Sequence, residues 1–326
     1  SDATPTTADL VIGQPDFVSN AENLGQGGNG PGVALPDSLQ FPGRVLVRGP
    51  DVYVADSGNS RVLHYTAPTA NKPFADQVFG QFDDFTRRAK NNDGTGQNGC
   101  CPSADNLFNP IGIALDVDDR LYIADWNNHR ILRLESPLTS DTTADAVFGQ
   151  PDFVSNTIDN GGPANGLQLP IDLAFDGAGN LYVADSGNHR VLLFQDPLLD
   201  ATADAVFGQL DTLSTDSPNH GLGFFMTDAD GLFGPTGVGL DNSGNLVVVD
   251  TNNQRVLRFD MPIAMLGDLN CDGSFDTQDI DAFSLALTDP DTYNAIYCDL
   301  NRGDFNIDGQ VNGHDIALFV SALISG

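Results

Sequence analysis

Residues 183–192 read VADSGNHRVL, and closely related stretches occur three more times in the chain. Each copy has a hydrophobic residue followed by Asp, Asn and Arg at fixed spacing, and then two apolar residues. The copies occupy residues 54–63, 123–132, 183–192 and 248–257, so the repeated Asp residues lie 69, 60 and 65 positions apart. Recurrence at such intervals indicates a protein built from one repeated supersecondary unit.

The rest of each unit also recurs. A Pro-led apolar alternation precedes each copy, at residues 42–47, 110–116, 170–176 and 235–241, and the signature Ala-Asp-x-Val-Phe-Gly-Gln follows three of them, at 75–81, 144–150 and 203–209. Each unit thus supplies four short strands separated by turn residues, which is typical of one propeller blade. The consensus resembles the NHL repeat over about residues 9–260, and the resemblance implies an all-β propeller.

The two ends of the repeat region are complementary. Leu10–Gln14 carries the Gly-Gln signature before any complete unit, whereas the last unit stops at Phe259 without one. We therefore expect this N-terminal strand to complete the blade of residues 234–260 and close the ring, which would remove an exposed sheet edge.

The repeat count predicts four blades of four antiparallel strands. NHL propellers more often have six shorter blades, so six is the alternative. The extra length of each unit lies in polar, Gly- and Asn-rich insertions, at about residues 17–40, 84–107, 154–168 and 211–233. Their composition does not suggest further strands.

The repeated polar residues have a structural interpretation. The Asp that ends the second strand can accept backbone N–H groups of the following turn, the Asn can take a left-handed conformation, and the Arg can reach a carbonyl or carboxylate. A scaffold needs these groups in every blade, whereas a catalytic site needs one set. We therefore expect the equivalent His129 and His189 to be structural, and we assign no catalytic or cofactor-binding residue.

A second, duplicated motif follows Pro262. The loops beginning at Asp268 and Asp304 both match the calcium-loop pattern D-x-N-x-D-G with a carboxylate at position 12, and Gly273 and Gly309 stand at the sharp turn. The predicted ligands of two Ca²⁺ ions are Asp268, Asn270, Asp272, Ser274 and Asp279 in the first loop, and Asp304, Asn306, Asp308, Gln310 and Asp315 in the second.

An apolar helix is expected after each loop, at residues 280–287 and 316–324. Asp in place of Glu at position 12, together with the lack of a clear helix before each loop, resembles a type I dockerin rather than a paired EF-hand. The sequence thus predicts two domains, a propeller over residues 1–262 and a small α-helical dockerin-like module over residues 263–326.

The four cysteines favour disulfides in an oxidising compartment, because no zinc-ligand spacing accompanies them. A bridge from Cys271 to Cys298 is expected, which departs from the dockerins of cellulosomes. The adjacent Cys100 and Cys101 form either a vicinal disulfide or two buried thiols.

The net charge of −31 argues against nucleic-acid binding, because 45 acidic residues face only 14 basic ones. No apolar run approaches the roughly 20 residues that span a membrane. The chain begins at Ser1 without Met or a signal peptide, which we interpret as the end of a processed mature protein. We expect a bacterial-type protein that is secreted or held at the cell surface.

Three classes of function are considered, of which carbohydrate binding through Phe82, Phe85, Phe224 and Phe225 in the insertions has no specific support. Two functions remain. The first is a non-enzymatic interaction or structural protein, in which the dockerin-like module binds a cohesin-like receptor or another copy of the chain, giving an oligomer or fibre. The second is an extracellular lyase or hydrolase with a metal in the propeller channel, as in enzymes that resemble this propeller. His64 and His220 are the unpaired candidates for such a site.

Overall fold

A computed structural model describes residues 8–25, 34–138, 142–162, 165–177, 179–195, 197–209, 218–223, 227–241, 244–259, 269, 277–290, 292–293, 303, 305 and 311–325. The chain divides into two compact units, of which the first holds Ser1–Phe175, Gly179–Gly239 and Val248–Leu257. The second holds the remainder, including Arg258–Gly326. The predicted domain boundary after residue 262 falls outside the described residues and stays a prediction.

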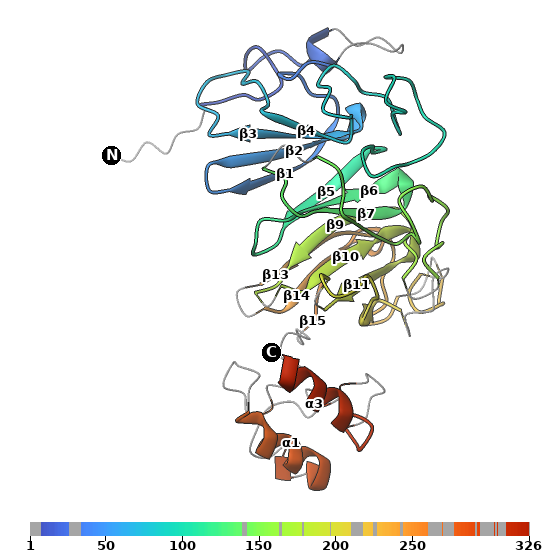
Figure 1. Ribbon diagram of the computed structural model, residues 1–326. Coiled ribbons are helices and arrows are strands. Elements are labelled where there is room, and N and C mark those ends of the chain that lie inside the picture. Colours follow the sequence, from blue (N-terminus) through green and yellow to red (C-terminus); the bar gives the residue numbers. More distant parts are fainter. Residues whose placement is uncertain are drawn as a thin grey trace. The chain divides into compact units, whose positions relative to one another are not determined.

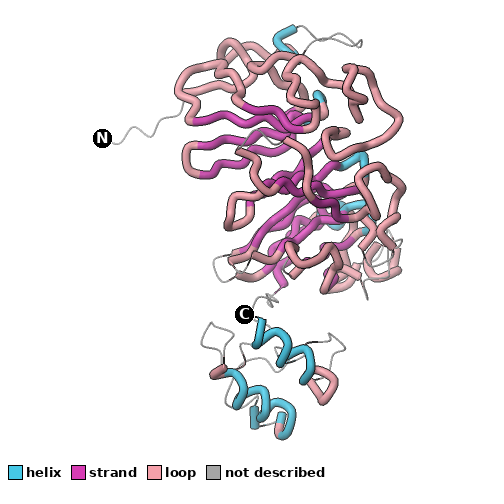
Figure 2. Tube along the Cα trace, in the orientation of Figure 1, coloured by secondary structure: helices cyan, strands magenta, loops and turns pink. Residues whose placement is uncertain are grey.

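Four antiparallel sheets follow one another along the chain (Figures 1 and 2). The first blade contains β1 (Pro42–Arg48), β2 (Asp51–Asp56), β3 (Arg61–Thr66) and β4 (Gln77–Phe79), and the second contains β5 (Pro110–Leu115), β6 (Leu121–Asp125), β7 (Arg130–Leu134) and β8 (Ala146–Phe148). The third contains β9 (Pro170–Phe175), β10 (Leu181–Asp185), β11 (Arg190–Phe194) and β12 (Ala205–Phe207), and the fourth contains β13 (Pro235–Leu240), β14 (Leu246–Asp250) and β15 (Arg255–Phe259).

The prediction of four blades is confirmed. Each inner strand begins at the expected Pro, and the strands of each sheet pair in sequence order. The described parts of the insertions contribute only the isolated bridges Gln81↔Asn106 and Asn92↔Asn98 beyond these sheets. Six blades would require further strands, which the described parts of these insertions do not form.

The core lies between successive blades, because strand alternation gives each sheet two apolar faces. On the second blade, Tyr122, Ala124 and Ile131 face the third blade, whereas Leu121 and Ile123 face the first. The repeat therefore places equivalent side chains at every junction, with Tyr, Ala and a β-branched residue directed toward the next blade.

The predicted closure by the N-terminal strand is wrong. The Val11 carbonyl accepts the N–H of Lys72, and Ile12 packs against the apolar side chains of the first blade. Gly13, with φ of +86°, lies over Leu39 just as Gly80 lies over Leu107. The later Gly-Gln signatures make the same contact with the following blade while ending their own blade. The prediction fails because residues 10–14 form no strand and the fourth blade has three strands among the described residues.

The C-terminal region contains α1 (Asp279–Thr288) and α3 (Ile316–Ser325), which agree with the two expected helices. Their shared core contains Ala282, Phe283 and Phe319, and the two phenylalanine rings stack with centroids 3.9 Å apart. The hydroxyl of Tyr293 donates to the Leu269 carbonyl at 3.0 Å. The helix pair therefore has its own small apolar core.

Cys100 and Cys101 form a vicinal disulfide, which settles the open alternative for this pair. Cys271 and Cys298 lie outside the described residues, and their bridge stays a prediction.

Candidate functional site

The repeated Asp, Asn and Arg residues form one polar network per blade. In the third blade, Asp185 Oδ2 accepts hydrogen bonds from Asn188 at 2.8 Å and from Arg190 Nε at 2.9 Å. All three residues are fully buried. The same pairs recur as Asp56 with Arg61, Asp125 with Arg130, and Asp250 with Arg255. The predicted Arg–carboxylate contact is therefore confirmed in every blade.

Two details of the predicted network are wrong. Asp56 Oδ1 accepts the N–H of Gln40, which precedes the inner strand, and does not cap the turn that follows Asp56. The Asn lies in a single 3₁₀ turn, and the residue after it takes the left-handed conformation, with φ of 51° at Ser60 and 53° at His129. The Asp at the end of the second strand thus fixes the segment that leads into the inner strand. The sequence of the turn alone does not predict this contact.

Each Arg also fixes an insertion loop. Arg61 Nη2 donates to the carbonyls of Leu35 and Ser38, and its Nη1 donates to Phe85 in the loop that leaves the blade. Arg130 repeats this arrangement with Ser103, Asn106 and Phe153. Burial raises the pKa of Asp185 to about 6, while Arg190 and the N–H donors favour the carboxylate. In the first three blades the Asp and Arg side chains of this network are completely buried, as a scaffold requires.

Sequence reasoning missed a further repeated residue. In each insertion one residue takes a left-handed conformation and accepts a side-chain hydrogen bond from the Asn of the repeat motif. These residues are Asn23, Asn91, Asp159 and Asn219. Each stands nine or ten residues after the Gln of a Gly-Gln signature. That spacing is the signal that would have revealed them.

His129 and His189 are structural, as expected. Their Nδ1 atoms accept the N–H groups of Leu169 and Gly234, each at 3.1 Å. Burial lowers the pKa of both imidazoles below the usual value, which keeps them neutral hydrogen-bond acceptors. They connect a blade to the inner strand of the next one.

The inner strands place four equivalent residues near the centre of the propeller, namely Arg44, Gly112, Asp172 and Gly237. Arg44 Nη1 lies 3.1 Å from each carboxylate oxygen of Asp172, but only the contact with Oδ2 has hydrogen-bond geometry. Asp172 Oδ2 also accepts the Val238 N–H at 3.1 Å. An ion pair between the first and third blades therefore occupies this position, with glycines in the other two.

Glycine is required at one of these positions by close packing. A Cβ on Gly112 would lie 2.7 Å from the Ile171 carbonyl oxygen and 3.0 Å from the Asp172 Cα. Burial raises the pKa of Asp172, against the opposing effects of the Val238 N–H and Arg44. The channel position thus contains an internally neutralised carboxylate rather than a set of histidines.

The two remaining candidate histidines both contact carboxylates. His64 Nε2 lies 2.8 Å from Asp51 Oδ1, and the imidazole is buried against Tyr53. His220 Nδ1 lies 2.7 Å from Asp228 and 3.7 Å from Asp230. Among the described residues, His220, Asp228 and Asp230 form the one group of three such ligands within 4.8 Å of one another.

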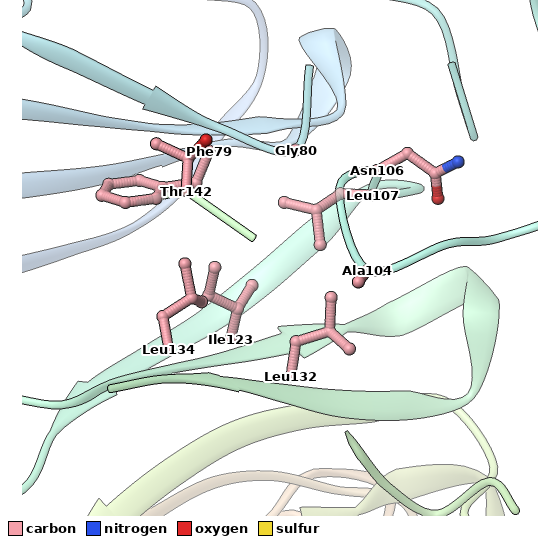
Figure 3. Close-up of a pocket in the computed structure, with 9 residues that line it drawn as sticks. All are labelled: Phe79, Gly80, Ala104, Asn106, Leu107, Ile123, Leu132, Leu134 and Thr142. Carbon is pink, nitrogen blue, oxygen red and sulfur yellow. The ribbon is translucent and has the colours of Figure 1, made fainter. Parts of the chain in front are cut away.

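A pocket between the first two blades is lined mainly by apolar side chains (Figure 3). Phe79 comes from β4, whereas Ile123 and Leu132 come from β6 and β7. Thr142 and Asn106 supply the polar side chains of the lining. With no charged group, this space resembles imperfect packing between blades rather than a catalytic site.

In the C-terminal region, Asp279 and Asp315 are the predicted calcium ligands that lie within the described residues. Both are fully buried, Asp279 as the first residue of α1 and Asp315 immediately before α3. Asp315 Oδ2 accepts the Asn312 N–H at 2.8 Å. The other eight predicted ligands, which are Asp268, Asn270, Asp272, Ser274, Asp304, Asn306, Asp308 and Gln310, lie outside the described residues.

No helix in the described part of the structure has the length and apolar character needed to cross a membrane.

Comparison with known proteins identifies the repeat. Residues 109–134, 167–194 and 234–259 match the NHL repeat. Protein SUPPRESSOR OF QUENCHING 1, chloroplastic, from Arabidopsis thaliana is 28% identical over 148 residues, which cover 44% of this chain and 13% of that protein.

Several solved structures are similar. Virginiamycin B lyase from Staphylococcus aureus has a TM-score of 0.37 and 13% identity over 67% of this chain and 55% of its own. A nidogen/laminin complex has a TM-score of 0.38 and 21% identity over 68% of this chain and 60% of its own. A putative gluconolactonase has a TM-score of 0.39 and 13% identity over 69% of this chain and 60% of its own. The present chain therefore contains NHL repeats in its second, third and fourth blades and folds as a four-bladed β-propeller of antiparallel strands.

Proposed function

We propose that this chain is a non-enzymatic, secreted interaction protein, in which a rigid propeller is held to a partner by a calcium-stabilised, dockerin-like module. The observation that carries the proposal is the pair of fully buried carboxylates, Asp279 and Asp315, at equivalent positions before two packed helices. Each stands at position 12 of a D-x-N-x-D-G loop.

A cation fits these residues on chemical grounds. A buried carboxylate is unfavourable unless a cation or hydrogen-bond donors compensate its charge. From Gly267 to Gly326 the sequence has eleven Asp and one Arg, a net charge of −10, so the chain supplies little positive charge of its own. Calcium prefers oxygen ligands of the kind that both loops contain.

The ten ligands fall into two sets. Asp268, Asn270, Asp272, Ser274 and Asp279 would hold one ion, and Asp304, Asn306, Asp308, Gln310 and Asp315 would hold the other. Bound calcium would supply positive charge to both loops and stabilise the fold around the Phe283–Phe319 stack. A cohesin-like receptor or another copy of this chain is the proposed partner, and the extracellular space is the proposed location.

The propeller supports the role of a rigid scaffold. Its repeated Asp and Arg residues form internal ion pairs, which are completely buried in the first three blades, and its central position contains the Arg44–Asp172 pair. Blades held together in this way are suited to presenting a stable surface.

Calorimetric titration of calcium into the full chain tests the proposal. We expect two sites, and we expect Asp279→Asn and Asp315→Asn each to remove or strongly weaken one of them. Asp281→Asn is the matched control, because Asp281 lies on the same helix but is exposed. Two intact sites in both variants, or no calcium binding by the parent protein, would contradict the proposal.

A metal-dependent lyase or hydrolase is the second candidate. The group of His220, Asp228 and Asp230 favours it, although this group lies in the insertion before the fourth blade rather than in the channel. Elemental analysis after dialysis against zinc or manganese tests it, with His220→Ala compared with His314→Ala at an exposed position. One metal ion lost only in His220→Ala would support this candidate, and no bound metal would remove its basis.

A further inference from the structure

The insertion between the first two blades carries the disulfide of Cys100 and Cys101, and both of these residues are exposed to solvent. A disulfide stabilises a protein mainly by restricting the unfolded chain, and this effect grows with the number of residues that the bridge encloses. A bridge between adjacent residues encloses none, so it contributes little to the stability of the propeller. Stabilisation of the fold therefore does not account for this bridge.

The other three insertions show that the repeat does not need a disulfide. In every blade the Arg of the repeat motif donates through Nη2 to a carbonyl of the preceding insertion. The acceptors of Arg61, Arg130, Arg190 and Arg255 are Leu35, Ser103, Gly166 and Gly231, respectively. Of the four insertions, only residues 84–107 contain cysteine. The Arg contact thus fixes an insertion to its blade without a disulfide in three cases out of four.

Hydrogen bonds of Asn106 connect the disulfide to the loop around it, which we call the cysteine loop (residues 91–106). The Asn106 side chain is buried and donates through Nδ2 to the Cys101 carbonyl at 3.3 Å. The same Nδ2 donates to the Asn92 carbonyl at 3.0 Å, and Oδ1 accepts the Ser103 N–H at 2.8 Å. A change in the conformation of the Cys101 backbone would therefore reach both ends of the cysteine loop.

The charge of this insertion is compatible with the approach of a thiolate. Residues 84–107 contain three acidic residues and three basic ones, so the insertion has no net charge, whereas the whole chain has a net charge of −31. The basic residues are Arg87, Arg88 and Lys90. An anionic nucleophile is therefore repelled less strongly at this insertion than the charge of the whole chain would imply.

We propose that Cys100–Cys101 is a reversible thiol–disulfide exchange site whose reductant is a dithiol, and that its redox state controls the order of the cysteine loop. Exposed disulfides are accessible to thiolates and are among those that are readily reduced. In the reduced protein the two sulfur atoms no longer fix the peptide between them, which weakens the hydrogen bond from Asn106 to Cys101. The site lies in the propeller and does not involve the calcium module.

The exchange takes place in two steps. One thiolate of the reductant attacks a cysteine sulfur, the bond between the two cysteine sulfurs breaks, and a mixed disulfide forms. The second thiolate of the reductant then attacks the mixed disulfide and releases the other cysteine. Two electrons and two protons pass in total from the dithiol to the cysteine pair, and the reductant becomes a disulfide.

Peptide-resolved alkylation tests the exchange. The full chain, with calcium present, is equilibrated with mixtures of reduced and oxidised dithiothreitol, and the free thiols are alkylated and located by mass spectrometry. We expect the Cys100–Cys101 pair to be reduced and reoxidised reversibly in the folded protein. The urea midpoint of the propeller, followed by Trp126 fluorescence, should be the same in both states. A pair that is reduced only after unfolding, or a reduced propeller that unfolds at a lower urea concentration, would show that the bridge is structural and overturn the proposal.

Hydrogen exchange tests the response of the loop. We expect backbone amides of the cysteine loop to exchange about fivefold faster after reduction, as the loss of one hydrogen bond implies. The insertion of residues 154–168, which has no cysteine, is the control and should not change. A variant with Cys100→Ser and Cys101→Ser should show the faster exchange with or without reductant. Unchanged exchange on reduction would overturn the switch, and a response to reductant that persists in this variant would assign it to Cys271 and Cys298 instead.

Discussion

The propeller and the C-terminal module bury carboxylates in different ways. Asp56, Asp125 and Asp185 each lie beside an Arg from the same hairpin, so the chain supplies the compensating charge. Asp279 and Asp315 are equally buried in a segment with a single Arg among eleven Asp. The Asp residues of the propeller repeat are therefore neutralised inside the chain, whereas those of the C-terminal repeat would, under the proposed function, be neutralised by calcium from solution. Four experiments test this contrast.

The largest effect is expected from breaking an internal pair. Asp185→Ala would leave the buried Arg190 without its carboxylate, which typically costs about 3–5 kcal/mol of unfolding free energy. Asp250→Ala should cost less, about 1–3 kcal/mol, because the partly exposed Arg255 remains accessible to water. Urea unfolding followed by the fluorescence of Trp126, the single tryptophan, gives both values. Equal losses would show that Arg255 is as buried in solution as Arg190.

The next effect is expected from calcium removal. A chelator should lower the unfolding temperature of the C-terminal module only, because the propeller supplies its own counter-charges. At a free calcium concentration near 100 times Kd, the loss is about 2.7 kcal/mol for each ion removed. Calorimetry resolves the transitions, and Trp126 fluorescence reports the propeller separately. A propeller transition that shifts equally with chelator would contradict the contrast.

A smaller effect is expected at the channel ion pair. Arg44→Met leaves the buried Asp172 without its cation and should cost about 1–3 kcal/mol. Burial already raises the pKa of Asp172, so the loss should increase as pH rises and the carboxylate ionises. Arg48→Met on the same strand is the control, because its pair with Asp119 is exposed and should contribute about 0–1 kcal/mol. Losses that do not depend on pH would indicate that packing by the Arg44 stem dominates.

Much of the propeller could be predicted from sequence because its signals are local and repeated. The Pro that begins each inner strand and the apolar alternation that follows it can be recognised within a few residues. Their fourfold recurrence makes the assignment of strands stronger. The repeated Asp and Arg are five residues apart, at the end of one strand and the start of the next, so the pairing of these strands brings the two side chains together. The two C-terminal helices follow in the same way from their apolar spacing.

The remaining features depend on contacts between distant segments. Asn23 contacts Asn59, and Asn91 contacts Asn128, across 36 and 37 residues that include the first two strands of the blade. The failed prediction of closure has a related cause. Gly13 packs on Leu39 as Gly80 packs on Leu107, but residues 10–14 form no strand beside β15. Sequence similarity identified the segment but not whether it pairs with the last sheet.

The smallest effect is expected from the junction histidines, whose neutral Nδ1 atoms accept backbone N–H groups. Burial lowers the pKa of His129 and His189, so an unfolded chain binds their protons more readily as the pH falls below about 6.5. The stability that they contribute at pH 7 is therefore lost on acidification. His129→Ser and His189→Gln introduce the residues that the first and fourth blades have at this position. We expect the double variant to lose less stability than the parent between pH 7 and pH 5, measured by urea unfolding with calcium held constant. An identical pH dependence in both proteins would mean that these imidazoles are protonated without cost, and that the two blade junctions do not depend on a neutral acceptor.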